Sequence, residues 1–320
     1  MNKKIKIVIL SFLFLLASSI LFLHLFPRAA FQLAAKWERT LSGVEKKLAI
    51  VDGWHFYYIE SKGSRAGKEI LLLVHGFGGD KDNWTRFIRY LPDRYHAIAP
   101  DLPGFGENDR KPKEWYDVRS QVERLHKFVQ QLGLRKFHIA GNSMGGHIAG
   151  IYAVTYPEEI LSVAFIDNAG VSSLQKSEHE KLLEKGINKL VAKNTKEFDE
   201  LLHFVFVKVP SIPDSILTVL AKRAIASNAF NQMVFEQYKH KKPYPLEPRL
   251  RDIQAPVWIL WGEKDRIIHV STVEVMKEKL TRAKKNFRVT ILPNCGHSPM
   301  IELPEISAEK YVLFLEQLPK

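Results

Sequence analysis

The chain has 320 residues, 46% of them hydrophobic, so it is long enough to build one large domain with a substantial core. Its single cysteine, Cys295, excludes an intrachain disulfide and a cysteine-rich zinc site. The formal net charge is +12, but the lysines and arginines are spread along the whole chain among acidic residues. We therefore expect a solvated basic surface and no nucleic-acid partner, with an anionic membrane surface as the alternative contact for these charges.

Residues 1–27 have the composition of a membrane anchor. Residues 7–26 form a run of 20 residues whose polar members are Ser11, Ser18, Ser19 and His24. A helix of that length rises about 30 Å, the thickness of the bilayer's hydrocarbon. A cleaved signal peptide is the alternative, but its apolar region is shorter, about 7–15 residues. We predict an uncleaved single-pass anchor, and the lysines ahead of the run place the following domain outside the cytoplasm.

The segments after the anchor alternate between two patterns. Residues 28–45 are expected to form an amphipathic helix next to the membrane, and residues 48–61 alternate and turn as a β-hairpin does. Continuous apolar runs of strand length then alternate with helical segments, which is typical of a mostly parallel α/β sheet. The runs are EILLLVHG, YHAIAPDLPG, KFHIAGNS, ILSVAFIDNA, APVWILWG and FRVTILPNCGH. We assign residues 46–171 and 249–320 to this α/β core.

Residues 172–248 interrupt the alternation. They contain four stretches with a helical pattern and no clear strand, beginning with SEHEKLLEKGINKLVAK and ending with FNQMVFEQYKH. We therefore expect one α/β domain that carries a helical insertion, which we call the insert.

The segment GNSMG, residues 141–145, fits the pattern G-x-S-x-G. In this pattern a serine sits on a sharp turn between a strand and a helix, and the flanking glycines relieve close contacts with the backbone. The pattern alone is weak, because a glycine-rich helix start would look the same. Here an apolar strand precedes it and a helix with small residues follows it, so Ser143 is the candidate nucleophile.

A serine hydroxyl needs a general base, and the base needs a carboxylate to orient it. In this pattern the carboxylate and then the histidine follow the serine along the chain. His297, in the loop LPNCGH after a strand, is the expected base, with His269 as the weaker candidate. Asp265, in the loop WGEKD, is the expected acid, and Asp167 at another strand end is the competing carboxylate.

The negative oxygen that forms during attack on a carbonyl needs two preorganised N–H donors. We expect one from the backbone of Met144, the residue after the serine, and one from the backbone of Phe77 in the glycine-rich loop HGFGG. We read Asp101, in PDLPG, as a turn-forming residue. The nucleotide-binding motifs are incomplete, and no cluster of histidine and acidic residues has metal-ligand spacing, so we predict no cofactor and no metal.

These motifs resemble the α/β-hydrolase superfamily from about residue 45 to the end. The stretches LLLVHGFGGDKDNW, GNSMGGHIAGIYAVTYPE, FVFVKVPSIPDSIL, VWILWGEKDRIIHVS and LPNCGHSPMIELP are similar to membrane-anchored monoacylglycerol lipases and to bacterial lipases with a GNSMGG turn. The resemblance implies an α/β-hydrolase fold with a helical cap formed by the insert. It assigns Ser143, Asp265 and His297 to the catalytic triad and Phe77 and Met144 to the oxyanion hole.

The resemblance implies a serine ester hydrolase that cleaves lipid-like acyl esters such as monoacylglycerols, with the membrane as its partner through the N-terminal helix. Asn142, before the serine, also occurs in hydrolases that cleave carbon–carbon bonds of ring-fission products, so that reaction is the alternative. A third alternative is a non-catalytic membrane-binding module of the same fold, which the complete set of triad residues disfavours.

Overall fold

A computed structural model describes residues 4–5, 8, 21–22, 25–241 and 243–318. Within this part of the chain, no helix is both long and apolar enough to cross a membrane. The anchor predicted over residues 1–27 falls mainly on residues outside the described ranges, so it stays a prediction.

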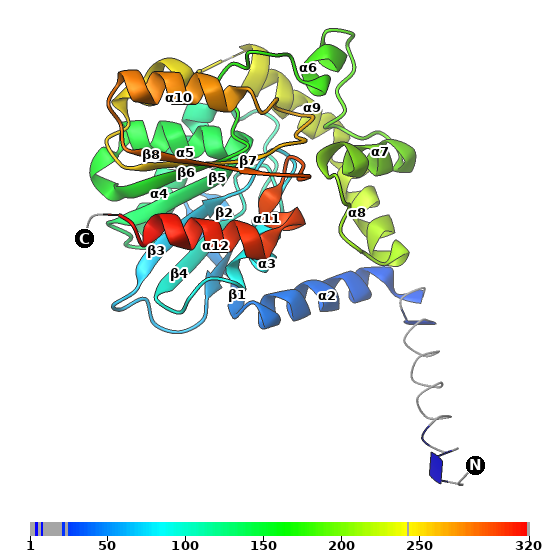
Figure 1. Cartoon of the computed structure of the whole chain (residues 1–320). Helices are drawn as coiled ribbons and strands as arrows, with labels where there is room; N and C mark the ends of the chain where they lie inside the picture. The colour runs from blue at the N-terminus through cyan, green and yellow to red at the C-terminus, as the bar shows by residue number, and fades with distance from the viewer. Residues whose placement is uncertain (1–3, 6–7, 9–20, 23–24, 242, 319–320) are drawn as a thin grey trace.

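One sheet of eight strands forms the centre of the molecule (Figure 1). The first three strands in the order below pair antiparallel, and every pairing from β4 onwards is parallel, as the alternating sequence pattern predicts. In spatial order the strands are β1 (Val44–Val51), β2 (Trp54–Ser61), β4 (Tyr95–Pro100), β3 (Glu69–Val74), β5 (Phe137–Asn142), β6 (Ile160–Ile166), β7 (Val257–Gly262) and β8 (Phe287–Leu292).

The predicted hairpin is formed by β1 and β2. Asp52 and Gly53 connect the two strands, and both have positive φ angles, 47° and 74°. Two successive residues in this conformation make the tight turn whose twist matches that of paired strands, and Asp-Gly is a preferred sequence for it.

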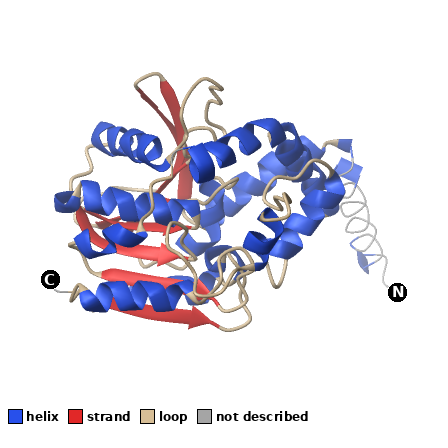
Figure 2. Ribbon diagram, turned by 90° about the horizontal axis from the view of Figure 1, so that it is seen from above, coloured by secondary structure: helices blue, strands red, loops and turns tan. Residues whose placement is uncertain are grey.

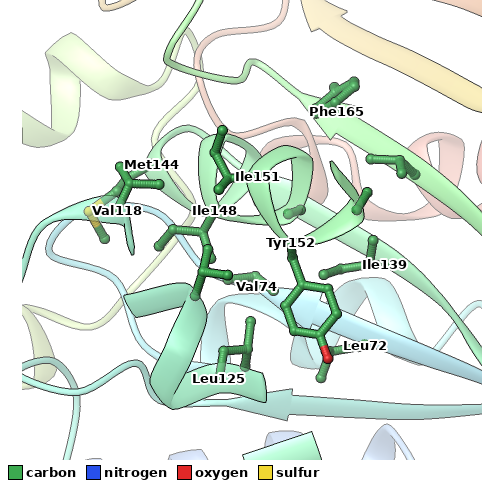
Figure 3. Packing of buried hydrophobic residues seen from close by; sticks show 14 of the residues in the cluster. Leu72, Val74, Val118, Leu125, Ile139, Met144, Ile148, Ile151, Tyr152 and Phe165 are labelled. Carbon is green, nitrogen blue, oxygen red and sulfur yellow. The ribbon is translucent and has the colours of Figure 1, made fainter. Parts of the chain in front are cut away.

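Helices cover both faces of the sheet (Figures 1 and 2). On one face lie α4 (Val118–Gln131), α5 (Met144–Thr155) and α10 (Thr272–Arg282), and on the other lie α3 (Thr85–Ile88), α11 (Pro299–Glu302) and α12 (Pro304–Leu315). Alternate residues of β3 enter two separate cores: Leu72 and Val74 pack in the cluster of Figure 3, while Leu71 and Leu73 pack in the cluster under α12. The parallel strands are therefore buried on both faces, which explains their continuous apolar sequences.

The insert connects β6 to β7 and lies beyond the carboxyl ends of the strands (Figure 1). Its helices are α6 (Glu178–Leu183), α7 (Thr195–Val205), α8 (Asp214–Ala226) and α9 (Asn228–Glu236), and the described residues of 172–248 contain no strand. The helix expected along residues 177–193 is shorter than predicted. It ends because Gly186 adopts a φ of 76°, which the helix cannot continue through. The last turn is closed by two hydrogen bonds, from the Gly186 N–H to the Leu183 carbonyl and from the Ile187 N–H to the Leu182 carbonyl.

Ahead of the sheet, α2 (Pro27–Leu41) runs from the N-terminal segment to β1 and packs against α8 of the insert. The amphipathic helix expected over residues 28–45 thus ends earlier than predicted. Gly43, with a φ of 64°, follows it, and β1 starts at Val44.

Candidate active site

Ser143 occupies the sharp turn between β5 and α5 that the motif predicts. Its backbone angles, φ 55° and ψ −122°, are ones that residues other than glycine rarely adopt. The turn is fixed from both sides, because the Ser143 N–H donates to the Ile166 carbonyl (2.9 Å) and the Ser143 carbonyl accepts from the Ala169 N–H (3.0 Å). The strain is thus held by hydrogen bonds to β6 and the loop that follows it.

The glycines of the motif are required by space rather than by backbone angle. A Cβ atom on Gly141 would lie 2.2 Å from the Gly145 carbonyl oxygen, and one on Gly145 would lie 2.3 Å from that of Val74. Contacts this short do not occur between real atoms, and the obstacles are backbone groups that cannot rotate away. Only glycine at both positions lets α5 start directly behind the serine.

Asp265 and His297 form a buried hydrogen-bonded pair. His297 Nδ1 lies 2.7 Å from Asp265 Oδ2, and the second carboxylate oxygen, Oδ1, accepts the backbone N–H groups of Ile267 (2.7 Å) and Ile268 (3.0 Å). Both carboxylate oxygens therefore accept hydrogen bonds. The carboxylate holds the imidazole so that Nε2 is free to act as a base.

The loop that carries His297 is held by three residues outside it. The His297 N–H donates to the Val205 carbonyl at the end of α7 (2.8 Å), and its carbonyl accepts from the Asn142 side chain (3.0 Å). Glu302 accepts the Gly296 N–H through Oε2 (2.9 Å) and the Lys208 N–H through Oε1 (2.7 Å). The insert and the residue before the serine thus both position the histidine.

The two predicted oxyanion donors belong to residues near the serine: Met144 follows it at the start of α5, and Phe77 lines the same cavity. The Met144 side chain is buried in the core, where Figure 3 shows it beside Val118, so only its backbone can serve the site. Within the described part of the chain, the N–H groups of Phe77 and Met144 have no hydrogen-bond acceptor. They are thus available to an oxygen bound next to Ser143, and Met144 adds the positive end of the α5 dipole.

A cavity of about 300 Å³ joins these elements. Phe77, Ser143 and His297 line it on the core side. The insert contributes nine apolar residues to the opposite wall: Leu190, Ala192, Phe198, Leu201, Leu202, Val205, Phe206, Leu220 and Ala224. Charged side chains line another part of the cavity: Asp80, Arg110 and Arg223. Along its apolar wall the cavity can therefore hold an aliphatic chain with one end beside the serine.

The weaker candidates of the sequence have other partners. His269 Nδ1 bonds the Ser271 hydroxyl (2.9 Å), so it is not the histidine on Asp265. Cys295 is fully buried, and this burial raises the pKa of its thiol, which makes it a poor nucleophile. Asp101 orders its turn by accepting the Lys81 ammonium (2.9 Å) and the Lys81 N–H (2.7 Å). Asp167 lies next to Asp265 but is bonded to the backbone N–H of Gly262.

Sequence reasoning missed the roles of Asn142 and Glu302 in holding the histidine loop. The side-chain nitrogen of Asn142 reaches both the Ile166 carbonyl (3.2 Å) and the His297 carbonyl, and so ties β5 to the loop. Glu302 follows the histidine by five residues, but no motif marks it. Its partner Lys208 lies in the insert, far away along the chain.

Comparison with known proteins places the chain among hydrolases. Residues 69–204 match the family model of the alpha/beta hydrolase fold, and residues 228–312 match that of the dienelactone hydrolase family. Lipase 1 of Psychrobacter immobilis is 36% identical, over 87% of this chain and 86% of its own. A monoacylglycerol lipase of Xenopus laevis is 33% identical, over 88% and 85% respectively. The chain belongs to the α/β-hydrolase family.

Solved structures of this family agree with that assignment. A membrane phospholipase A described as a bacterial virulence factor superposes with a TM-score of 0.88 at 44% identity, covering 98% of this chain and 99% of its own. A putative lipase of Acinetobacter baumannii gives a TM-score of 0.81 at 34% identity, covering 90% and 96%. Within the α/β-hydrolase family, the chain is a serine hydrolase of the lipase type.

Proposed function

We propose that the chain hydrolyses lipid-like acyl esters, monoacylglycerols among them, through a triad of Ser143, His297 and Asp265. The observation that carries the proposal is the cavity, which has the strained serine and the histidine held by Asp265 on one wall and the insert's apolar residues on the other. Relatives named lipase and monoacylglycerol lipase support the substrate class.

In this mechanism His297 Nε2 takes the proton of the Ser143 hydroxyl as its oxygen attacks the ester carbonyl. The Phe77 and Met144 N–H groups stabilise the negative oxygen that results, a contribution of about 10²–10³ in rate for each donor. The imidazolium gives its proton to the leaving alkoxide, which departs as an alcohol such as glycerol. Water, deprotonated by the same imidazole, then releases the acyl group from the serine as a carboxylic acid.

The insert acts in this proposal as a cap that accepts the acyl chain. Phe198, Leu201 and Leu202 of α7 present apolar surface to the cavity, and the end of α7 also holds the His297 loop. A bound acyl chain therefore packs on the same helix that positions the general base. We expect long- and medium-chain esters to be cleaved faster than acetates.

Membrane attachment is the second part of the proposal. Leu33, Trp37 and Leu41 are four residues apart on α2, so they share one face of the helix, and all three are exposed. An exposed tryptophan among leucines, with Arg28 and Lys36 nearby in the helix, is typical of a helix that lies in a bilayer interface. We propose that α2 rests on the membrane beside a spanning segment in residues 1–27, with the catalytic domain outside the cytoplasm.

The test is hydrolysis by the purified full-length chain of a chain-length series of monoacylglycerols and p-nitrophenyl esters. Ser143→Ala is expected to abolish hydrolysis and labelling by a fluorophosphonate probe, while the exposed control Ser64→Ala leaves both unchanged. Hydrolysis that survives Ser143→Ala refutes the triad, and an acetate optimum refutes the lipid substrate. A ring-fission product in the same panel, cleaved in preference to esters, would establish the carbon–carbon alternative that Asn142 suggested.

The proposed membrane attachment is tested separately, by sedimenting the protein with lipid vesicles. Trp37→Ser combined with Leu33→Ser is expected to weaken binding to anionic vesicles when residues 1–26 are removed, because these side chains supply the exposed apolar face of α2. Leu174→Ser, at an exposed leucine outside α2, is the control. If the double variant bound vesicles as well as this control, α2 would not be the membrane-binding face. Reporter fusions at the C-terminus determine which side of the membrane the domain occupies.

A further inference from the structure

Asp167, directly after β6, is a carboxyl group that the proposed mechanism does not use. It is completely buried, and its φ of 45° lies in the left-handed region that few residues other than glycine adopt. Its Oδ1 accepts the Gly262 N–H at the end of β7 (2.9 Å). Its Oδ2 is also buried and has no hydrogen-bond partner among the described residues. A buried polar atom without a partner is costly and requires an explanation.

The neighbours of Asp167 supply that explanation. Asp167, Asp265 and His297 each place one nitrogen or oxygen atom within 4.8 Å of the others. Asp265 accepts three hydrogen bonds, two from backbone N–H groups and one from His297, and donates none. A carboxyl group with only donors around it is stabilised in its ionised form. The negative charge of this pair of acids therefore belongs on Asp265.

Two buried carboxyl groups this close do not both ionise, because like charges in a dry interior repel strongly. Burial and then the Asp265 charge raise the pKa of Asp167 well above its ordinary value. The other titratable groups that face Asp167 include Glu302, whose charge acts in the same direction, and the Cys295 thiol. A proton on Oδ2 turns the atom without a partner into a donor with an acceptor nearby.

We infer that Asp167 is a neutral carboxylic acid that donates a hydrogen bond from Oδ2 to the Asp265 carboxylate and so positions the acid of the triad. The inference rests on the proposed triad. Gly262 donates to one oxygen of Asp167, Asp265 accepts the hydrogen bond from the other, and Asp265 in turn holds His297. Asp167 contacts no substrate, so it is a positioning residue, not an alternative triad acid.

The test compares Asp167→Asn with Asp167→Ala in the full-length chain. Asparagine has the same shape, tolerates a positive φ, and offers an N–H₂ donor to Asp265 while its oxygen accepts from Gly262. We expect Asp167→Asn to keep kcat/KM within about threefold of the wild type, and Asp167→Ala to lose about tenfold or more in kcat with KM nearly unchanged. Thermal unfolding of both variants separates this loss from failure to fold.

The dependence of kcat/KM on pH distinguishes a charged Asp167 from a neutral one, which a loss of folding stability would not. If Asp167 is neutral in the wild type, the amide variant has the same charge, and the acid limb of kcat/KM coincides in the two proteins. If Asp167 is ionised, removing its charge shifts that limb to lower pH by about one unit, which overturns the inference. The infrared difference spectrum between the two should contain the C=O band of a protonated carboxyl group. A carboxylate band in its place also overturns it.

Two controls keep this outcome apart from other failures. Loss of activity on treatment with EDTA would mean that a bound cation, not a proton, neutralises the two acids, and the inference would be wrong. Fluorophosphonate labelling of Ser143 in each variant reports whether the nucleophile still functions. Hydrolysis that depends on Ser143, together with a shifted acid limb in Asp167→Asn, rejects the role of Asp167 and leaves the proposed function intact.

Discussion

The backbone N–H of His297 donates to the carbonyl of Val205, 2.8 Å away at the end of α7. The general base proposed for the reaction is therefore attached to the helix that forms much of the apolar wall. Glu302 strengthens the same connection by accepting N–H groups from Gly296, in the histidine loop, and from Lys208, in the insert. Movement of α7 away from the core would displace the histidine loop as well.

Removing the Glu302 carboxylate should therefore impair catalysis more than substrate binding. We expect Glu302→Ala to lower kcat about tenfold with a smaller change in KM, because a small displacement of the base is costly to the chemical step. Steady-state kinetics on a medium-chain p-nitrophenyl ester measures both constants. Glu305→Gln, an exposed acid on α12, is the control and should match the wild type. Equal kcat values in all three proteins would show that the connection does not position the base.

The space requirement at Gly145, two residues after the serine, can be tested by comparison with Gly150 of the same helix. A Cβ on Gly145 would meet the Val74 and His75 carbonyls at 2.3 and 2.4 Å, whereas one on Gly150 would meet side chains only: the ends of Leu246 at 2.7 Å and the ring edge of Phe165 at 2.9 Å. Backbone cannot yield but a leucine can change rotamer, so Gly145→Ala should lose activity and stability, by about 1–3 kcal/mol. Gly150→Ala should cost less stability than Gly145→Ala, because its obstacles are side chains that can shift and alanine favours the helix by about 1 kcal/mol. Urea unfolding measures the stability of the two variants, and ester hydrolysis measures their activity. Equal losses in both variants would contradict the special space requirement at Gly145.

The strands and the serine turn were predictable because each has a local cause in the sequence. Continuous apolar runs mark strands buried on both faces, and the glycine at position 141 is required by its contact with Gly145, four residues further on. Gly145 itself faces the distant Val74 and His75 carbonyls, but the G-x-S-x-G pattern marks it too. The order of serine, acid and histidine along the chain then restricted the candidates for the acid and the base. The eight-stranded sheet and the family match confirm the α/β assignment.

The supports of the site were not predictable, because they join residues that are distant along the chain. The contacts of Glu302 with Lys208, and of Asn142 with His297, exist only once the insert and the sheet have packed. The spread of lysines and arginines predicts a solvated basic surface, yet Lys81 is buried against Asp101. The length of α6 was also misjudged, since a helical pattern continues past Gly186 while the backbone does not.

The buried ion pair of Lys81 should contribute strongly to the stability of the fold. Its side chain is 1% exposed and its ammonium bonds Asp101 (2.9 Å) and Glu107 (2.7 Å). Replacing Lys81 by methionine leaves the fully buried Asp101 without its cation, so we expect a loss of about 3–5 kcal/mol in the free energy of unfolding. Lys127→Met breaks an exposed pair with Asp52 and should leave stability nearly unchanged. Denaturant titrations that give similar losses for both would refute the importance of burial.

Glu60 should make stability depend on pH in the acid range. Burial alone would raise its pKa, but hydrogen bonds from His96, Arg65 and Lys47 lower it to about 2, from an ordinary value of 4.5. A carboxyl group whose pKa is lower in the folded state stabilises the protein above its ordinary pKa, and this contribution is lost as the pH falls towards the lowered value. Because Arg65 and Lys47 are partly exposed and screened, the contribution should be about 1–2 kcal/mol.

The variant Glu60→Gln has no such carboxyl group, so its deficit against the wild type should be largest near neutral pH. The deficit should shrink steadily as the pH falls from about 5 towards about 2, because the wild type then loses the same contribution. Thermal unfolding at a series of pH values measures the difference. Glu316→Gln, which removes an exposed partner of Arg94, provides the baseline and should show a small deficit at every pH. A Glu60→Gln deficit that stays constant, or grows, on acidification would show that the three hydrogen bonds do not hold the carboxylate in its ionised form.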